Sequence, residues 1–220
     1  MEDALPAFVL HSETANPAVM PDLMPDLKIA PPISPGESPD SSDEQLMQAF
    51  AGGRSSAFSA LFDRYRQPIF GFFRRRVSDP AHAEELAQET FLAVLHAASR
   101  YQPTALFRTW LYAIAFKILR AHRRKSAFRA TFLGAPKEVP DPAARSTLDT
   151  EILVRHAVAK LDPLDREILL LREFEQHSYG EISTVLDVPL NTVRSRLFRA
   201  RLALHSLLAA PSATRQKESL

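Results

Sequence analysis

The sequence of 220 residues predicts an all-α protein with two small helical domains joined by a flexible linker, the second a helix-turn-helix (winged-helix-like) domain. The first reason is that no segment alternates apolar and polar residues as a half-buried strand does, whereas apolar residues recur at helical spacing through most of the chain. The second is that residues 127–150 interrupt this spacing and contain three prolines. The third is a pair of short apolar stripes in residues 178–205, separated by a turn that contains a proline.

Residues 1–42 are predicted to form a disordered tail, because they are rich in proline and show no lasting periodicity. Nine acidic residues and one basic residue give residues 1–44 a net charge of −8, whereas the remainder of the chain carries +9. A basic body beside an acidic tail favours a polyanionic partner for the body. The alternative is that the tail only keeps the protein in solution. Residues 211–220 are expected to form a second, short tail.

The composition excludes several classes of protein. The chain has no cysteine, which argues against a disulfide scaffold, a zinc ribbon or a thiol switch and favours a cytoplasmic protein. The seven histidines have no histidine or cysteine partner at helical spacing, so neither a metal site nor a cofactor is expected. No apolar run approaches the ~20 residues of a membrane helix, so no membrane insertion is expected. Glu2 and Asp3 stand where a secretory signal would carry basic residues.

The first helical domain is predicted to span residues 43–126, beginning at a helix cap within residues 41–44. Inside it, residues 81–98 form a helix with one apolar side. The other side carries a compact polar group, namely Glu84, Glu85, Gln88 and Glu89. The ordinary interpretation of such a group is a solvated face. Paired carboxylates can also indicate acid–base catalysis, but no nucleophile, metal cluster or phosphate-binding glycine loop accompanies them, so no catalytic residue is expected.

A further helix, residues 107–125, combines apolar residues that fill a core with a series of basic residues. Aromatic side chains interleaved with basic side chains suit the binding of single-stranded DNA. Nucleobases stack on the rings for ~1–3 kcal/mol each, while lysine and arginine bind the phosphate backbone. The candidate contacts, including those in the preceding loop, are Arg100, Tyr101, Phe107, Arg108, Trp110, Lys117, Arg120, Arg123 and Arg124. The alternative is that the aromatic residues belong to the core, which we expect for most of Trp110.

The second domain is predicted to span residues 151–210, and its residues 178–205 read SYGEISTVLDVPLNTVRSRLFRARLALH. Pro189 ends the first helix of this segment, because proline disfavours a helical conformation in the residue before it. In the second helix, Val193, Leu197, Ala200 and Leu204 share a face that must pack on the first. The residues on and beside the opposite face are candidate major-groove contacts, namely Asn191, Thr192, Arg194, Ser195, Arg196, Phe198 and Arg199.

Two observations favour a DNA-reading helix over a surface helix with scattered arginines. Phe198 lies opposite the buried stripe, where an ordinary surface helix carries a polar residue. Four arginines within residues 194–201 also exceed the basic density of a typical exposed face. Two of them, Arg196 and Arg201, lie nearer the edge of the core, where they bind either a phosphate or an acid inside the domain.

The run LDPLDREILLLREFEQHSYGEISTVLDVPLNTVRSRLFRARLAL resembles the promoter-reading domain of bacterial sigma factors of the extracytoplasmic-function group. FRTWLYAIA, in residues 107–115, is similar to that family's strand-opening helix, and residues 81–98 resemble its core-binding helix. The resemblance implies that residues 151–210 read the minus-thirty-five element and that residues 43–126 bind core RNA polymerase and open the minus-ten element. It further implies that residues 100–107 capture a flipped base and that the group from Glu84 to Glu89 contacts the polymerase.

We therefore interpret the chain as a sigma factor without catalytic activity, with core RNA polymerase and promoter DNA as its expected partners. Members of the family that it resembles often have an anti-sigma protein as well, and the sequence does not reveal one for this chain. One rival is a response-regulator-type activator, which also ends in a helix-turn-helix. It would need a ligand or phosphoacceptor domain of roughly 100 residues with strands, and no strand pattern occurs here. The other rival is an enzyme with an incidental helical fold.

Overall fold

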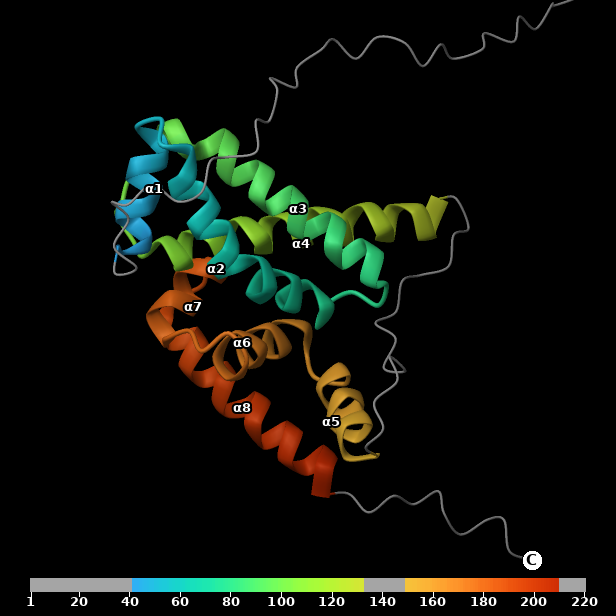
Figure 1. Ribbon diagram of the computed structural model, residues 1–220. Helices are drawn as coiled ribbons and strands as arrows, with labels where there is room; N and C mark the ends of the chain where they lie inside the picture. The colour runs from blue at the N-terminus through green and yellow to red at the C-terminus, as the bar shows by residue number, and fades with distance from the viewer. Residues whose placement is uncertain (1–40, 133–148, 210–220) are drawn as a thin grey trace, which may run out of the picture. The chain divides into compact units, whose positions relative to one another are not determined.

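The computed structural model describes residues 41–132 and 149–209, most of which lie in eight α-helices (Figure 1). The helices are α1 (Asp43–Ala51), α2 (Ser55–Arg74), α3 (Pro80–Ala97), α4 (Phe107–Phe132), α5 (Asp149–Ala159), α6 (Pro163–Glu173), α7 (Tyr179–Leu186) and α8 (Leu190–Ala209). These two ranges contain no β-strand, so the all-α prediction is confirmed for them and the helix-turn-helix has no β-wing there. The predicted tails and most of the predicted linker lie outside the described residues.

Helices α1 to α4 form the first bundle, in which each helix packs on the next along the chain. Its core contains Phe72, Phe91 and Leu111, all buried. Ser42 begins α1 with a capping box, in agreement with the predicted cap. A carboxylate oxygen of Glu44 accepts a hydrogen bond of 2.7 Å from the backbone N–H of Phe107, and this bond lowers the pKa of Glu44. Helix α1 thereby caps the first turn of α4.

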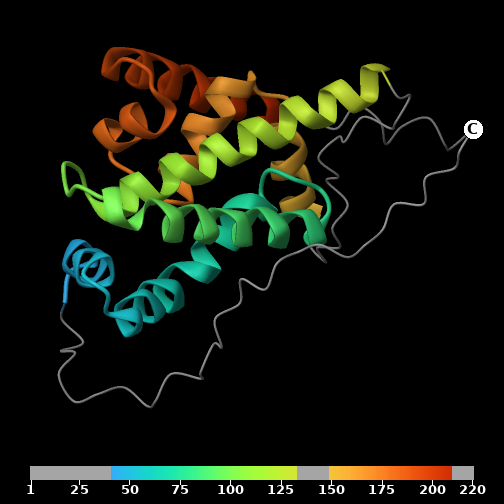
Figure 2. The ribbon, with the colours of Figure 1, turned by 90° about the horizontal axis from the view of Figure 1, so that it is seen from above.

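Helix α4 is longer than the sequence analysis expected. It continues to Phe132, so the prediction of irregular chain from Ala127 onward is wrong. No glycine or proline occurs in α4 before Gly134, and nothing local ends the helix earlier. The last turns of α4 project beyond the neighbouring helices in both ribbon views (Figure 1, Figure 2). They carry two exposed rings, Phe128 and Phe132, whose centroids lie 4.6 Å apart.

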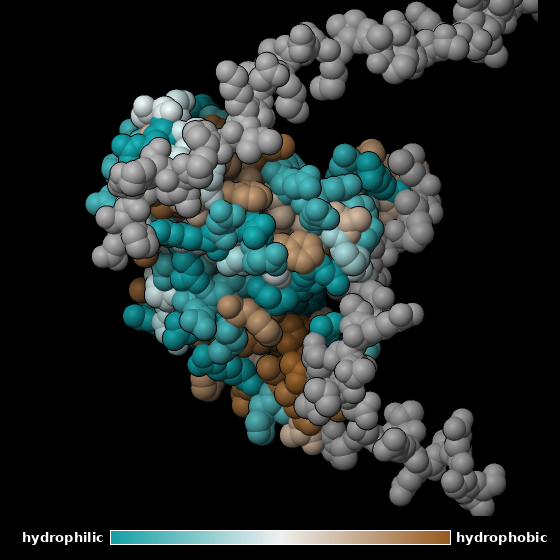
Figure 3. Space-filling view, viewed as in Figure 1, coloured by the Kyte–Doolittle hydropathy of each residue, from teal (hydrophilic) through white to brown (hydrophobic). Residues whose placement is uncertain are grey.

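Helices α5 to α8 form the second bundle, in which α5, α6 and α7 all pack on α8. Ser178 begins α7 with a capping box in which Glu181 is the reciprocal partner. Asp187 ends α7 with a φ of 56°, and α8 begins at Leu190, so the predicted helix-turn-helix is confirmed. Figure 3 shows apolar surface over part of this bundle. The exposed leucines of the bundle include Leu153 and Leu208.

The two bundles are in contact, and their buried apolar residues form one cluster. Helix α4 of the first bundle packs along α7 of the second. The sequence analysis predicted a linker between the domains but gave no sign of this contact. Ion pairs such as those of Arg76 and Arg123 with Glu167 contribute to it, and a pattern of apolar residues does not reveal them.

Candidate nucleic-acid and polymerase interfaces

Helix α8 presents a polar and aromatic face opposite its buried stripe. Val193, Leu197 and Ala200 are buried in the second bundle, which confirms the predicted facing of the helix. The predicted contact residues that are exposed on the other side are Asn191, Arg194, Ser195, Phe198 and Arg199, while Thr192 is half-buried. The ring of Phe198 is 70% exposed. This face therefore offers guanidinium groups, short polar side chains and one aromatic ring to a partner.

The turn between α7 and α8 fixes the direction of this face. Asp187 adopts the left-handed conformation there, which a short polar side chain tolerates better than a bulky one. The hydroxyl of Ser183 donates a hydrogen bond of 2.6 Å to the backbone carbonyl oxygen of Val188, across the turn. These features set the geometry of the turn that leads from α7 into α8.

Arg196 and Arg201 pair with acids inside the second bundle. Nη1 of Arg196 lies 3.0 Å from Oδ1 of Asp162 and 2.9 Å from Oδ1 of Asp165. Nη2 of Arg201 lies 2.7 Å from Oε1 of Glu173. The sequence left open whether these arginines bind a phosphate or an internal acid, and the structure shows the internal acids. These three ion pairs join α8 to α6 and to Asp162, the residue that caps α6.

Four predicted polymerase contacts, Glu84, Glu85, Gln88 and Glu89, are exposed on α3. The same face continues into apolar residues that the sequence analysis missed. Leu92 is 53% exposed and lies one helical turn beyond Gln88 and Glu89, and Leu95 follows it by one more turn. The signal that could have identified these leucines is their position away from the buried stripe. A polar group bordering exposed leucines is the composition of a protein interface.

An aromatic cluster stands where the loop of residues 101–106 meets α4. The ring centroid of Trp110 lies 5.0 Å from that of Tyr101 and 5.8 Å from that of Phe107. Tyr101 and Trp110 are half-buried, but Phe107 is only 1% exposed. The structure therefore places Phe107 in the core and not on a DNA-binding surface. Burial and the nearby carboxylates of α1 raise the pKa of Tyr101, which keeps its hydroxyl protonated.

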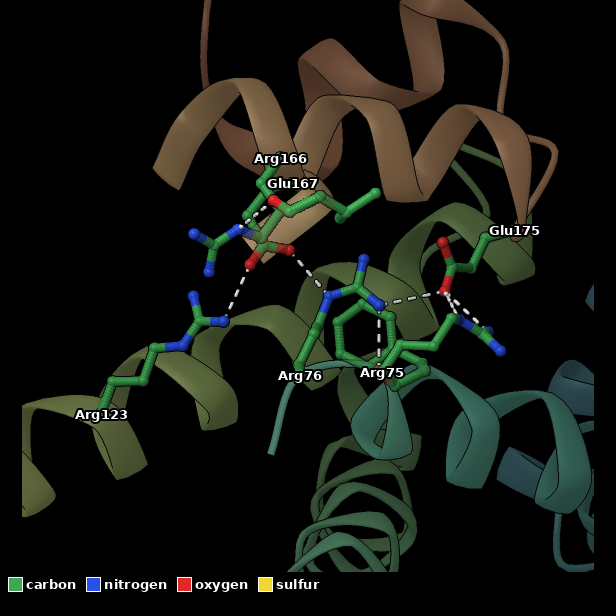
Figure 4. A network of polar contacts seen from close by, with 8 residues as sticks. Arg75, Arg76, Arg123, Arg166, Glu167 and Glu175 are labelled. Carbon is green, nitrogen blue, oxygen red and sulfur yellow. Dashed lines mark hydrogen bonds and ion pairs between the residues drawn. The ribbon is translucent and has the colours of Figure 1, made fainter. Parts of the chain in front are cut away.

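The predicted DNA-binding cations of the first bundle differ in what they face. Lys117, Arg120 and Arg124 are exposed on α4 at spacings of three and four residues, so they share one face. Arg100 is exposed before the loop, and Arg108 is half-buried with its guanidinium carbon 5.8 Å from the centre of the Tyr112 ring. Arg123 is engaged elsewhere, because its Nη2 lies 2.9 Å from Oε1 of Glu167 on α6 (Figure 4).

Comparison with known proteins identifies both bundles. The family description "Sigma-70 region 2" matches residues 61–128, and "Sigma-70, region 4" matches residues 151–204. The RNA polymerase sigma-H factor of Pseudomonas aeruginosa is 35% identical over 180 residues, which cover 76% of this chain and 93% of the relative. The ECF RNA polymerase sigma factor SigC of Mycobacterium tuberculosis is 34% identical over 172 residues, which cover 74% of this chain and 92% of the relative.

Two solved structures share the fold. CnrH, in complex with the cytosolic domain of CnrY, aligns with a TM-score of 0.62 at 26% identity, over 78% of this chain and 100% of that one. The sigma factor RpoE of Bartonella quintana, in complex with the anti-sigma factor NepR, aligns with a TM-score of 0.60 at 22% identity. The second alignment covers 70% of this chain and 98% of that one, and it shows the fold alone.

The two bundles and their faces therefore define a promoter-specificity factor of the sigma-70 class, a family of non-catalytic transcription regulators. Within that class the chain belongs to the extracytoplasmic-function group of RNA polymerase sigma factors, which direct promoter-specific transcription initiation. This membership removes the response-regulator-type activator that a helix-turn-helix alone allowed. Among the helices that the structure describes, none is long and apolar enough to cross a membrane.

Proposed function

We propose that the two bundles divide promoter recognition, with residues 151–210 reading the minus-thirty-five element and residues 43–126 binding core polymerase and opening the minus-ten element. The observation that carries this division is the outward face of α8. Phe198 is 70% exposed there, on the side of the helix that points away from the buried Val193 and Leu197. Exposed arginine, asparagine and serine surround this ring, which is the chemistry of a major-groove reader.

On α8, each outward residue has a chemically distinct role. Arg194 and Arg199 bind guanine edges or phosphates, because guanidinium forms two parallel hydrogen bonds with either. Asn191 and Ser195 hydrogen-bond base edges, and the Phe198 ring contacts a thymine methyl group. Arg196 positions the helix through Asp162 and Asp165, since it would have to leave two carboxylates to bind a phosphate.

In the first bundle, α4 and the preceding loop form the strand-opening site. Tyr101 and Trp110 offer half-exposed rings for a nucleobase to stack on, and Phe107 supports them from the core. The strip of Lys117, Arg120 and Arg124 holds the phosphate backbone beside these rings. Extruding a base costs a few kcal/mol of stacking, which a shaped aromatic site offsets.

The exposed face of α3 docks on core polymerase in this proposal. Glu85, Gln88 and Glu89 supply its polar rim and Leu92 its apolar centre. Polymerase performs the chemistry, so the chain needs no catalytic residue of its own and acts where polymerase is, in the cytoplasm. An anti-sigma partner is also proposed, because RpoE of Bartonella quintana is bound to one.

Run-off transcription with purified core polymerase that lacks any other sigma factor tests the proposed function. We expect start-site-specific transcripts when the full chain is added, and a changed preference at upstream bases when Phe198→Ala replaces it. Transcripts that are absent, or equally abundant with core polymerase alone, would refute the proposal.

A further inference from the structure

Helix α4 carries charge of one sign along its whole length. Of its 26 residues, seven are lysine or arginine and none is aspartate or glutamate. Three of the seven cations, Arg124, Lys125 and Arg129, are exposed near the C-terminal end of the helix. A surface with several exposed cations and no acid of its own is complementary to a polyanion.

Two exposed aromatic rings stand among these last cations. Phe128 is 59% exposed and Phe132 is 70% exposed, and their ring centroids lie 4.6 Å apart with the ring planes inclined at 34°. Both rings lie on the turns of α4 that project beyond the neighbouring helices (Figure 1, Figure 2). Adjacent exposed apolar groups, unlike single ones, mark a binding site on a protein surface.

The pair of rings continues the face of α4 that carries the proposed strand-opening site. Phe128 follows Arg124 by four residues. Lys117 lies seven residues before Arg124 and seven residues after Trp110. Spacings of four and seven residues return a side chain to the same face of a helix, which turns by about 100° per residue. This face of α4 therefore has aromatic rings at both ends and cations between them.

Rings and cations in this order are complementary to an unpaired DNA strand. A phenylalanine ring stacks on the flat face of a nucleobase, and the cations bind the phosphates that join successive bases. In a duplex, neighbouring base pairs cover the flat faces of the bases, so the rings would find no partner of this kind there. The chemistry of the surface thus favours a single strand over a duplex.

We propose that Phe128 and Phe132 form a second stacking site for unpaired bases of promoter DNA, at the opposite end of α4 from Tyr101 and Trp110. This inference rests on the proposed function, in which α4 binds the opened strand. Trp110 and Phe128 are 18 residues apart, which is about 27 Å along the helix. This distance corresponds to about eight nucleotides at the ~3.4 Å spacing of a stacked strand. A strand bound at both sites is held apart from its complement along the length of α4.

A length series of single-stranded oligonucleotides tests the second site on the full chain assembled with core polymerase. The oligonucleotides carry the non-template strand of a mapped promoter and grow by one nucleotide at a time, in either direction from the minus-ten element. Anisotropy of a fluorescent label on the DNA measures binding. Affinity should rise by about five- to 150-fold, the effect of one additional stacked base, once the strand extends about eight nucleotides beyond the first site.

Variants at the end of α4 assign this step to the two rings. Phe128→Ala with Phe132→Ala should abolish the step and leave the binding of shorter oligonucleotides unchanged. Phe128→Leu with Phe132→Leu keeps apolar side chains without rings and should also lose the step. Thr131→Ala is the matched control, because Thr131 is exposed on the same turn and has no ring. Lys125→Gln with Arg129→Gln should lower the slope of log affinity against log salt by about 1.4, or about 0.7 for each cation.

The outcomes separate the second site from the proposed function. If the natural chain gives no start-site-specific transcript with core polymerase, the proposed function fails. If the natural chain transcribes, the second site is overturned by a length series without the step, or by an alanine double variant that retains it. A leucine double variant that binds as the natural chain does overturns stacking, because an apolar contact then suffices. The second site is equally overturned if the alanine double variant loses affinity for core polymerase itself, or loses as much affinity for a blunt duplex.

Discussion

Neighbouring substitutions on α8 separate the role of its buried face from that of its exposed face. Leu197 is 1% exposed, so Leu197→Ala leaves a cavity and should destabilise the second bundle by about 2–5 kcal/mol. This is a large part of the roughly 5–15 kcal/mol that stabilises an ordinary domain. Phe198 is 70% exposed, so Phe198→Ala should change the free energy of unfolding by no more than about 0.5 kcal/mol. The loss of its base contact should instead cost about 1–3 kcal/mol of promoter discrimination.

Denaturant unfolding measures the first quantity, and competition between promoter fragments that differ at single upstream base pairs measures the second. Discrimination should fall roughly five- to 150-fold for Phe198→Ala. Leu208→Ala, also an exposed apolar truncation on α8, is the control and should change neither quantity. The assignment of the two faces is refuted if Phe198→Ala unfolds the bundle while promoter preference stays the same.

Three further predictions concern other surfaces. Glu85→Lys with Glu89→Lys should weaken a pull-down of core polymerase and preserve the fold, because both side chains are exposed; undiminished binding would return the group to a solvated face. His177 is buried, and the groups around it are Tyr112, Arg108, Glu175 and Glu181. Burial above all lowers the pKa of His177. A chain whose bundles have separated therefore binds a proton at His177 more readily than a chain whose bundles are in contact. The contact between the two bundles should therefore be fully stable above about pH 6.5 and weaken as the pH falls below it. The measurement is the radius of gyration of the free chain, which should grow as the bundles separate. The prediction is contradicted if a natural chain and a His177→Gln chain respond to pH alike. Residues 1–40 lie outside the described residues, and their removal tests whether the acidic tail competes with promoter phosphates. Competition predicts tighter DNA binding by the truncated free chain, most of all at low salt, whereas equal affinities across a salt series leave the tail as a solubilising extension.

The sequence predicted those features that depend on the spacing of apolar residues. The stripe of Val193, Leu197 and Ala200 identified α8 as an amphipathic helix and gave its outward face, because only one face of that helix can be buried. The polar group on α3 was placed correctly for the same reason. Pro189 and the cap near Ser42 set helix ends through local backbone chemistry, which needs no knowledge of the fold.

The features that the sequence did not reveal depend on individual long-range partners. Glutamate and arginine are almost always assigned to the surface. Nothing in the sequence near Arg76 indicates that this residue is buried and pairs with the carboxylate of Glu167, 91 residues away. Phe107 was predicted to contact DNA because aromatic residues among basic residues suit both a core and a nucleobase-stacking site. Only the packing of Tyr101 and Trp110 against Phe107 shows which of the two this ring belongs to. Helix α4 continues past its predicted end at Lys125, because the composition there contains no signal that ends a helix.

The arginines of this chain differ in whether an acidic side chain pairs with them. Arg194 and Arg199 have exposed side chains on the outward face of α8, the proposed reading face, whereas Arg196 and Arg201 pair with acids of α6. Arg123 lies within α4, the proposed strand-opening helix, yet the acid that it pairs with, Glu167, belongs to the other bundle. If Arg123 binds a promoter phosphate as the sequence predicts, the phosphate and Glu167 compete for the same guanidinium group. DNA binding at α4 would then weaken this contact between the two bundles, and by linkage loss of the contact would favour DNA binding.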